Sequence, residues 1–411
     1  MTIKTLTNRP ARVLILIKID SVVPMDLERI KKELIAFVDA RRDDFIHVSE
    51  ELFHNPETGL NEVRSAALLT DRLEAEGFRV ARGVAGLPTA FRADSGEKGP
   101  AIGIIAEMDA LPGLGHACGH NVIAAAALGA AIALRRVLPA DAARLVVLGT
   151  PAEEIGVGKV EMIRHGIFDD VEFAMMVHPS SRRYVIKHYL GLAKIRFVFL
   201  GKPAHAAAYP EEGINALDGV IQLFNAVNAL RQQLRQDVRV HGIITDGGVA
   251  PNIIPERASA FFYVRADDMA ELERVQERVI ACARGAATAT GCGLEIEEDP
   301  RVMAPLKVNY RFSDLYAEQL AYLGLELSES RPDRNKGSSD IGNVSQIMPT
   351  IHPHVPIGEG INIHSDAFAR ATVSARGKAA VVEGATALAL TAAELIARPE
   401  LREEILREFR G

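Results

Sequence analysis

The sequence predicts an α/β fold with a mostly parallel sheet and helices on both faces, plus an inserted α+β unit of the ferredoxin-like β-α-β-β-α-β type. Short apolar runs that end in polar residues alternate with helical segments at 101–109, 144–154 and 171–179, as in strands buried on both faces of a parallel sheet. Near residue 191 the rhythm changes to strand, helix, strand, strand, helix, strand. The chain has 411 residues, 48% of them hydrophobic, and this length suggests two domains.

The N-terminal run VLILIKI is the first candidate element. It is too short to cross a bilayer, and no small-residue cleavage site follows it. We interpret residues 1–24 as a strand or an extension outside the main fold. Helical periodicity then fills residues 27–53 and 63–76, and we expect the second helix to end at Gly77.

The inserted unit is complete in itself. Its expected elements are strands at 191–201, 238–247, 257–267 and 292–299 and helices at 214–234 and 270–289. A helix at 313–324 and an alanine-rich C-terminal helix then return to the first domain. We therefore predict one domain from residues 1–186 and 304–411, interrupted by a second at 187–303. The loops 331–343 and 352–368 are rich in Gly, Pro, Asn and Ser and are candidate active-site loops.

Composition favours a small-molecule substrate. The net charge is −7 and there is no long basic run, so neither nucleic acid nor a membrane is predicted as a partner. The three cysteines have no paired spacing, which is more typical of the reducing cytoplasm than of a secreted disulfide framework.

Side chains that bind metals gather where the predicted strands end. They are Asp109, His116, Cys118, His120, Glu153, Glu154, His178 and, much later, His364. Each one alone is more simply interpreted as a packed core residue or a solvated loop residue. Open α/β sheets, however, place their ligands at this edge, and packing does not explain so many metal-binding residue types there. A mixed set of sulfur, nitrogen and oxygen donors predicts Zn or Mn, with Co and Ni as alternatives.

Cys118 and His120 are two residues apart, so an extended backbone would point both side chains the same way. They precede a predicted helix at 121–137. Because a helix N-terminus favours negative charge, we expect the Cys118 thiolate to be stabilised even before a metal binds.

The adjacent carboxylates of Glu153 and Glu154 would repel each other without a cation. If Glu154 binds the metal, Glu153 stays free, with a raised pKa, and can take a proton from water as a general base. Asp109 is expected either to bridge two ions or to orient His120 from behind.

Five motifs then match one family in order and spacing: MDALPGLGHACGHNVIAAAALGAA, PAEEIGVGKVEMIRHGIFDDVEFAMMVHP, GKPAHAAAYPEEGINALDGVI, GGVAPNIIPERASAFFYVRA and GSSDIGNVSQIMPTIHPHVPIG. The chain resembles the dinuclear metallopeptidases that include aminoacylases, hippurate hydrolase and carboxypeptidase G, and it looks most similar to their p-aminobenzoyl-glutamate hydrolase branch. The similarity extends from ELFHNPETGLNE to the C-terminal helix.

The resemblance implies roles for particular residues. The implied metal ligands are Cys118, His120, Glu154, His178 and His364. Glu153 is implied to be the general base, and the insertion a lid and dimerisation domain. His205 would reach the active site of the partner subunit and stabilise the oxyanion, and Asn252 would help to hold the substrate.

Two positions depart from the family pattern. Glu107 and Asn121 stand where relatives often have Asp. Both substitutions bear on how two ions would be bridged, so we expect one or two ions per subunit. Arg182, Arg183 and Arg265 are candidates to bind a substrate carboxylate, with Arg265 preferred, although an arginine is more often simply a surface charge.

The sequence therefore predicts a cytoplasmic, homodimeric amidohydrolase that cleaves an N-acyl or aroyl amino acid or a dipeptide. Three alternatives stay open. The first is a metal-dependent deaminase that releases ammonia from an activated aromatic amine. The second is a non-catalytic relative that only binds its ligand, and the third is a hydrolase with Cys118 as nucleophile and His120 as its base.

Overall fold

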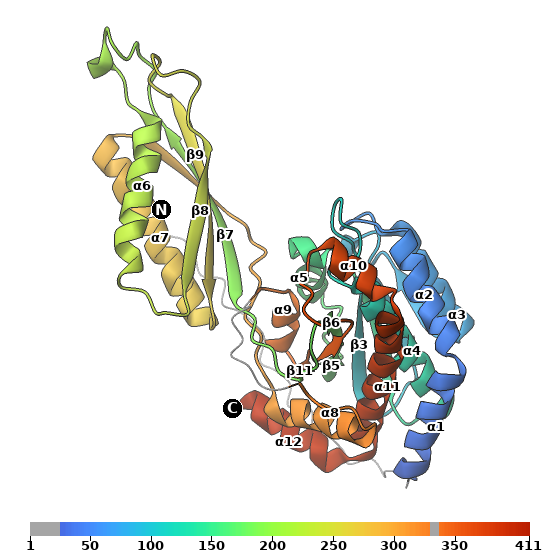
Figure 1. Cartoon of the computed structure of the whole chain (residues 1–411). Coiled ribbons are helices and arrows are strands. Elements are labelled where there is room, and N and C mark those ends of the chain that lie inside the picture. The colour runs from blue at the N-terminus through green and yellow to red at the C-terminus, as the bar shows by residue number, and fades with distance from the viewer. Residues whose placement is uncertain (1–24, 329–336) are drawn as a thin grey trace.

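The computed structural model describes residues 25–328 and 337–411. They form a large unit around a six-stranded sheet and a smaller unit around a four-stranded sheet, which projects from the large one (Figure 1). The VLILIKI run lies outside the described residues.

The helices and strands follow one another along the chain as two α/β stretches separated by the smaller unit. The helices are α1 (Leu27–Ala40), α2 (Arg42–His54), α3 (Val63–Ala75), α4 (His120–Val137), α5 (Gly158–Arg164), α6 (Ala216–Arg231), α7 (Met269–Thr290), α8 (Tyr310–Tyr322), α9 (Ile341–Ser345), α10 (Asp366–Thr372), α11 (Ala375–Ala397) and α12 (Pro399–Arg410). The strands are β1 (Arg79–Arg82), β2 (Phe91–Ser95), β3 (Ala101–Glu107), β4 (Arg144–Thr150), β5 (Phe173–Met175), β6 (His178–Ser180), β7 (Gly191–Leu200), β8 (Arg239–Asp246), β9 (Arg257–Ala266), β10 (Gly293–Glu298), β11 (Thr350–Ile351) and β12 (His354–Pro356). Short 3-10 turns lie at Val84–Gly86 (η1), Glu153–Ile155 (η2) and Pro210–Glu212 (η3).

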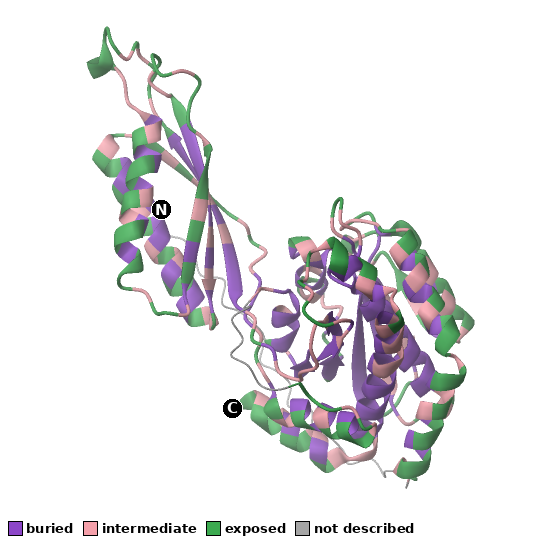
Figure 2. Cartoon of the chain, in the orientation of Figure 1, coloured by how far each residue is buried: buried purple, intermediate pink, exposed green. Residues whose placement is uncertain are grey.

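The large sheet has the order β1-β2-β4-β3-β5-β11. The four strands from β4 to β11 are parallel, as predicted, whereas β1 and β2 add an antiparallel edge that the sequence pattern does not indicate. Side chains alternate across β3: Ile102 and Ile104 join the core under α4 and α11, and Ile105 joins the core under α5 and α9. Burial on both faces explains the continuous apolar runs (Figure 2).

Helix α11 packs against α4 in the interior of the large unit. It has the length and mean hydropathy of a membrane span, but 83% of its most apolar window is buried within the fold. Small alanine side chains allow the two helix backbones to approach closely, which explains the alanine-rich composition of both. We therefore interpret α11 as a core helix.

The smaller unit has the predicted β-α-β-β-α-β order, and its antiparallel sheet runs β10-β7-β9-β8. Helices α6 and α7 cover one face, where Phe197, Phe199 and Phe262 are fully buried. The ferredoxin-like insertion is therefore confirmed, whereas the domain boundaries at 187 and 303 stay predictions.

Three expectations about single elements were wrong. The helix expected at 27–53 breaks at Arg41, whose guanidinium lies 2.6 Å from the Glu76 carboxylate beyond α3, a contact that sequence periodicity does not encode. The run 171–179 divides into β5 and β6, because β6 leaves the large sheet to pair with β12. The loop 352–368 contains β12 and the start of α10, and the described part of the loop 331–343 runs into α9.

Candidate active site

Parallel strands β3 and β4 end side by side, with Glu107 opposite Thr150. The chain segments that follow them carry the acidic residues predicted to be functional. Asp109 lies two residues beyond β3, and Glu153 and Glu154 lie in the η2 turn just beyond β4. Their position at one sheet edge agrees with the general placement of ligands in open α/β sheets.

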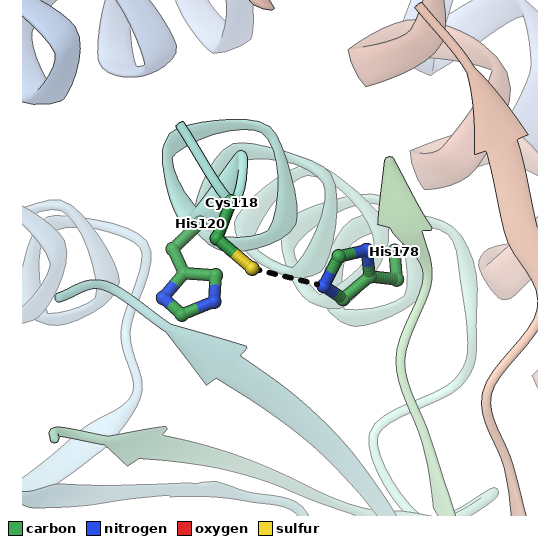
Figure 3. A group of neighbouring side chains, drawn as sticks. All are labelled: Cys118, His120 and His178. Carbon is green, nitrogen blue, oxygen red and sulfur yellow. Dashed lines mark hydrogen bonds between the residues drawn. The ribbon is translucent and has the colours of Figure 1, made fainter. Parts of the chain in front are cut away.

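Cys118, His120 and His178 form the first group of potential ligands. Cys118 precedes α4, His120 is the first residue of that helix, and His178 begins β6 (Figure 3). The Cys118 Sγ atom lies 3.5 Å from His178 Nε2, and one donor atom from each of the three side chains lies within 4.8 Å of the others. All three side chains are buried.

Glu154 and His364 form a second group with the same cysteine. One donor atom each from Cys118, Glu154 and His364 lies within 4.8 Å of the other two, and His364 Nε2 is 3.7 Å from Glu154 Oε2. His364 has a φ of 62°, and its backbone N–H donates to Ala117 O at 2.9 Å. A positive φ at a non-glycine residue is often found at functional sites.

Asp109 holds members of both groups. Its Oδ1 atom lies 2.9 Å from His120 Nδ1, and its Oδ2 atom accepts the backbone N–H of Glu154 at 3.1 Å. The side chain is fully buried. Of the two predicted roles, the geometry favours orientation of His120, since the imidazole then presents Nε2 to the ligand group.

The turn that carries Glu153 and Glu154 is fixed by its surroundings. Ala152 has φ 56° and ψ 40°, a left-handed conformation, and its N–H donates to the buried Glu62 carboxylate at 2.8 Å. Glu62 also accepts the Thr89 hydroxyl at 2.7 Å. Gly158 follows at the start of α5, where an added Cβ would clash with Pro151 O. Sequence reasoning did not identify Glu62, although it is the last residue of the ELFHNPETGLNE segment at which the similarity begins.

The donor set fits divalent metal ions. His120 Nε2 and Glu154 Oε1 are buried without a hydrogen-bond partner, and leaving such atoms unpaired costs about 1–3 kcal/mol each. A cation would satisfy both. Cys118 belongs to two of the ligand groups, so this arrangement suits one ion or two neighbouring ions.

The pKa shifts follow from burial and charge. Burial raises the pKa of the Cys118 thiol well above its ordinary value, which is opposite in direction to the expected stabilisation of a thiolate before metal binding. Burial lowers the pKa of His178 to about 4, so its imidazole is neutral and free to bind metal. Burial, followed by the charges of Glu107 and Asp340, raises the pKa of Glu153 well above its ordinary value.

Several residues of the site were not predicted. Lys159 on α5 is fully buried between Glu107 and Asp340, 2.6 and 2.5 Å from their carboxylate oxygens. His352 and His354 pack around His178, with ring centroids 5.2 and 5.1 Å from it. A lysine in a helical segment usually lies on the protein surface, so Lys159 gave no signal of a buried role. The loop 352–368 was predicted to be an active-site loop, but its residues His352 and His354 were not singled out.

Other predicted residues lie elsewhere in this chain. His205 and Asn252 are exposed, and their loops pair where Ala206 N donates to Asn252 O at 3.0 Å. The loop between β7 and α6 lies at the end of the smaller unit that points away from the large unit (Figure 1). Arg265 donates to Ser338 Oγ at 2.8 Å, beside the large unit.

Two further candidates have structural partners. Arg183 forms an ion pair with Glu383 of α11. Asn121 donates to Ser49 Oγ at 3.0 Å and to Thr372 Oγ1 at 3.1 Å, which ties α4 to α2 and α10. Its amide nitrogen therefore contacts neighbouring helices, whereas its Oδ1 atom is buried without a hydrogen-bond partner among the described residues.

Known proteins are similar to this chain in sequence. Residues 190–289 match the peptidase dimerisation domain. The chain is 36% identical over 401 residues to Xaa-Arg dipeptidase of Mus musculus, across 94% of this chain and 93% of that protein. It is 34% identical over 345 residues to one of the subunits of p-aminobenzoyl-glutamate hydrolase from Escherichia coli, across 78% of this chain and 70% of that protein.

Solved structures share the fold. One is a dinuclear metal-binding peptidase of the M20 family from Bacillus subtilis, with a TM-score of 0.69, 21% identity, and coverage of 87% of this chain and 99% of that one. Another is an aminobenzoyl-glutamate utilization protein from Klebsiella pneumoniae, with a TM-score of 0.64, 21% identity, and coverage of 89% and 98%. The predicted α/β fold with an inserted unit is confirmed.

Proposed function

The chain belongs to the M20 family of metal-dependent peptidases and hydrolases, and from this premise we propose that it cleaves the amide bond of a dipeptide or of an N-acyl or aroyl amino acid. One observation carries the proposal. Two ligand groups share Cys118, and the carboxylate of Glu153 lies beside them, within 4.8 Å of donor atoms of His120 and Glu154. The Xaa-Arg dipeptidase and the p-aminobenzoyl-glutamate hydrolase both bear names of amide-cleaving enzymes.

Metal and protein have separate tasks in this proposal. Divalent ions held by the five ligands would polarise the amide carbonyl and lower the pKa of water toward about 7. Glu153 takes a proton from the attacking water as the new C–O bond forms, and it gives that proton to the amine nitrogen as the C–N bond breaks. Burial raises the pKa of Glu153, which favours the protonated form that donates to the amine nitrogen. The products are a carboxylic acid and an amine.

We propose Mn or Zn as the resident ions, with Co and Ni as alternatives, because the ligands combine thiolate sulfur, imidazole nitrogen and carboxylate oxygen. We also propose a cytoplasmic location. The three free cysteines support it, since a reducing compartment keeps thiols unpaired.

The dimerisation domain suggests a pair of chains. We propose that His205 from the partner copy completes each active site by donating to the oxyanion. His205 is exposed on the smaller unit. This position supports the role, because an exposed side chain is accessible to the active site of a second copy. Asn252 lies in the adjoining loop and would bind the same substrate, whereas Arg265 would require its contact with Ser338 to break.

A hydrolysis screen tests the proposed function. Metal-free protein would be loaded separately with Mn²⁺ and Zn²⁺ and offered dipeptides, acyl and aroyl amino acids, and aromatic amines, with products identified by mass. We expect a free acid and an amine. Ammonia release would instead indicate the deaminase, and no turnover with any substrate would favour a binding protein.

The same assay examines the base and the nucleophile. The E153Q variant should bind metal as the wild type does and lose about 10²–10⁴ in kcat, whereas E161Q, on α5, should retain activity. Chelation should abolish activity and added metal should restore it. Activity that survives chelation would instead support Cys118 as nucleophile.

A further inference from the structure

A buried ammonium group lies next to the proposed base. The Lys159 side chain is fully buried on α5, and its Nζ atom lies 2.6 Å from Glu107 Oε1 and 2.5 Å from Asp340 Oδ1. The backbone N–H of Lys159 also donates to Asp340 Oδ2 at 3.0 Å. Lysine is almost never fully buried unless it is paired, so this position needs an explanation.

The two partners of Lys159 belong to a cluster that includes the base. One carboxylate oxygen each from Glu107, Glu153 and Asp340 lies within 4.8 Å of the other two, and all three residues are buried. Carboxylate oxygens in this arrangement are preferred ligands of Mg²⁺ and Mn²⁺. Lys159 is the cation that contacts both Glu107 and Asp340, while His120 approaches the cluster from the other side, at Glu107 and Glu153.

The cluster also touches the metal ligands. Glu107 Oε2 lies 3.4 Å from His120 Nε2 and is buried without a hydrogen bond, while Oε1 contacts Lys159. Without the ammonium, Asp340 would lose its ion-pair partner and Glu107 would keep only the contact with His120, so both buried carboxylates would be poorly compensated. Such anions are costly unless they are protonated or gain another cation.

We propose that Lys159 is a positioning residue that serves as a built-in cation: it holds Glu107 and Asp340, keeps divalent ions out of the Glu107–Glu153–Asp340 cluster, and so leaves Glu153 unligated. This inference rests on the proposed role of Glu153 as base. Burial disfavours the charged form of Lys159, but the charges of Asp340 and Glu107 outweigh it and raise its pKa, which favours the ammonium form.

Metal stoichiometry tests the inference. Metal-free wild type and K159M would be dialysed against Mn²⁺, and bound metal would be counted per chain by plasma mass spectrometry. Methionine keeps the length of the side chain and removes the charge. We expect K159M to hold one more ion per chain than the wild type, and the double variant K159M/E107Q to return to the wild-type number because the cluster then lacks one carboxylate.

The chain offers a matched control. Lys31 is also buried and pairs with a single carboxylate, that of Glu394, between α1 and α11. The K31M variant should keep the wild-type metal stoichiometry, because no comparable cluster of carboxylates surrounds Lys31 in the described part of the chain. A gain in K31M would show that the extra ion reflects general loosening and would overturn the inference.

Folding gives a second measurement if K159M is unstable without metal. An ion that replaces the ammonium stabilises the folded state by mass action, so the melting temperature of K159M should rise more steeply with Mn²⁺ concentration than those of wild type and K31M. A K159M protein with wild-type stoichiometry, or with no steeper dependence on Mn²⁺, would overturn the inference. Neither readout needs a substrate, so failure of the proposed amide hydrolysis would be distinguished from failure of this inference.

Discussion

Replacement of Asp109 by Asn isolates the contribution of one buried carboxylate to metal binding. Asp109 uses one oxygen on His120 Nδ1, at 2.9 Å, and the other on the backbone N–H of Glu154, at 3.1 Å. Asparagine has the same shape but only one acceptor oxygen. In D109N, therefore, either His120 or Glu154 must face an NH₂ group, and one of the two ligands loses its orientation.

The expected loss follows from two independent estimates. Leaving one buried donor without its acceptor costs about 1–3 kcal/mol. Loss of a group that orients a metal ligand typically lowers metal affinity by about 10–100-fold, which corresponds to about 1.4–2.7 kcal/mol. The two ranges overlap, so we expect the Zn²⁺ or Mn²⁺ affinity of D109N to fall by about one to two orders of magnitude.

Titration calorimetry of the metal-free proteins measures this loss directly. The control is D71N, because the Asp71 side chain is 72% exposed on α3 and its one ion pair among the described residues is with Arg82. D71N should bind metal as the wild type does. A folded D109N whose metal affinity equals that of the wild type would refute the proposal that Asp109 orients His120 and Glu154 for metal binding.

Three further predictions concern the dimer, the Glu62 carboxylate and the turn after β4. Mixing E153Q with H205A after reversible dissociation should restore activity, because a mixed dimer contains one site with both groups intact; no recovery would contradict a site shared between subunits. Burial raises the pKa of Glu62 above its ordinary 4.5, so its favourable contribution to folding is full below 4.5 and is lost as pH rises through the folded-state pKa. E62Q should therefore gain stability relative to wild type as the pH rises above 4.5 in urea unfolding, and a relative loss would contradict the sign. G158A should destabilise the fold by about 1–3 kcal/mol through the clash with Pro151 O, whereas G285A, in open space on α7, should stabilise it by about 0.5–1 kcal/mol; equal thermal shifts would refute the steric argument.

The parts of the fold that sequence predicted are those encoded by local pattern. The apolar runs of β3 and β4 reveal burial on two faces, and the elements of the smaller unit alternate at the periods of helices and strands. The edge strands β1 and β2 were missed because they are short and partly exposed, so their sequences lack a continuous apolar run. The division of 171–179 depends on β12, which lies far along the chain, and no local signal marks it.

The candidate metal ligands could likewise be predicted from local sequence, whereas the residues that hold them in place could not. Cysteine, histidine and adjacent glutamates at strand ends are uncommon enough to be noticed in sequence, and Cys118, His120, Glu154 and His178 indeed converge. Supporting residues have ordinary types in ordinary places. Lys159 meets a partner 181 positions away in the sequence, and such a contact exists only once the chain has folded.

The residues that support the candidate ligands nevertheless act on one short segment of the backbone. Three carboxylates from distant parts of the chain each accept one backbone N–H between residues 152 and 159: Glu62 from Ala152, Asp109 from Glu154 and Asp340 from Lys159. This segment presents both the proposed base and a metal ligand. The three acceptors restrain the same backbone, so loss of one hydrogen bond also weakens the other two. The effects of paired substitutions on the free energy of unfolding should therefore not be additive. The position of Glu153 is therefore a property of the network rather than of its neighbours in the sequence.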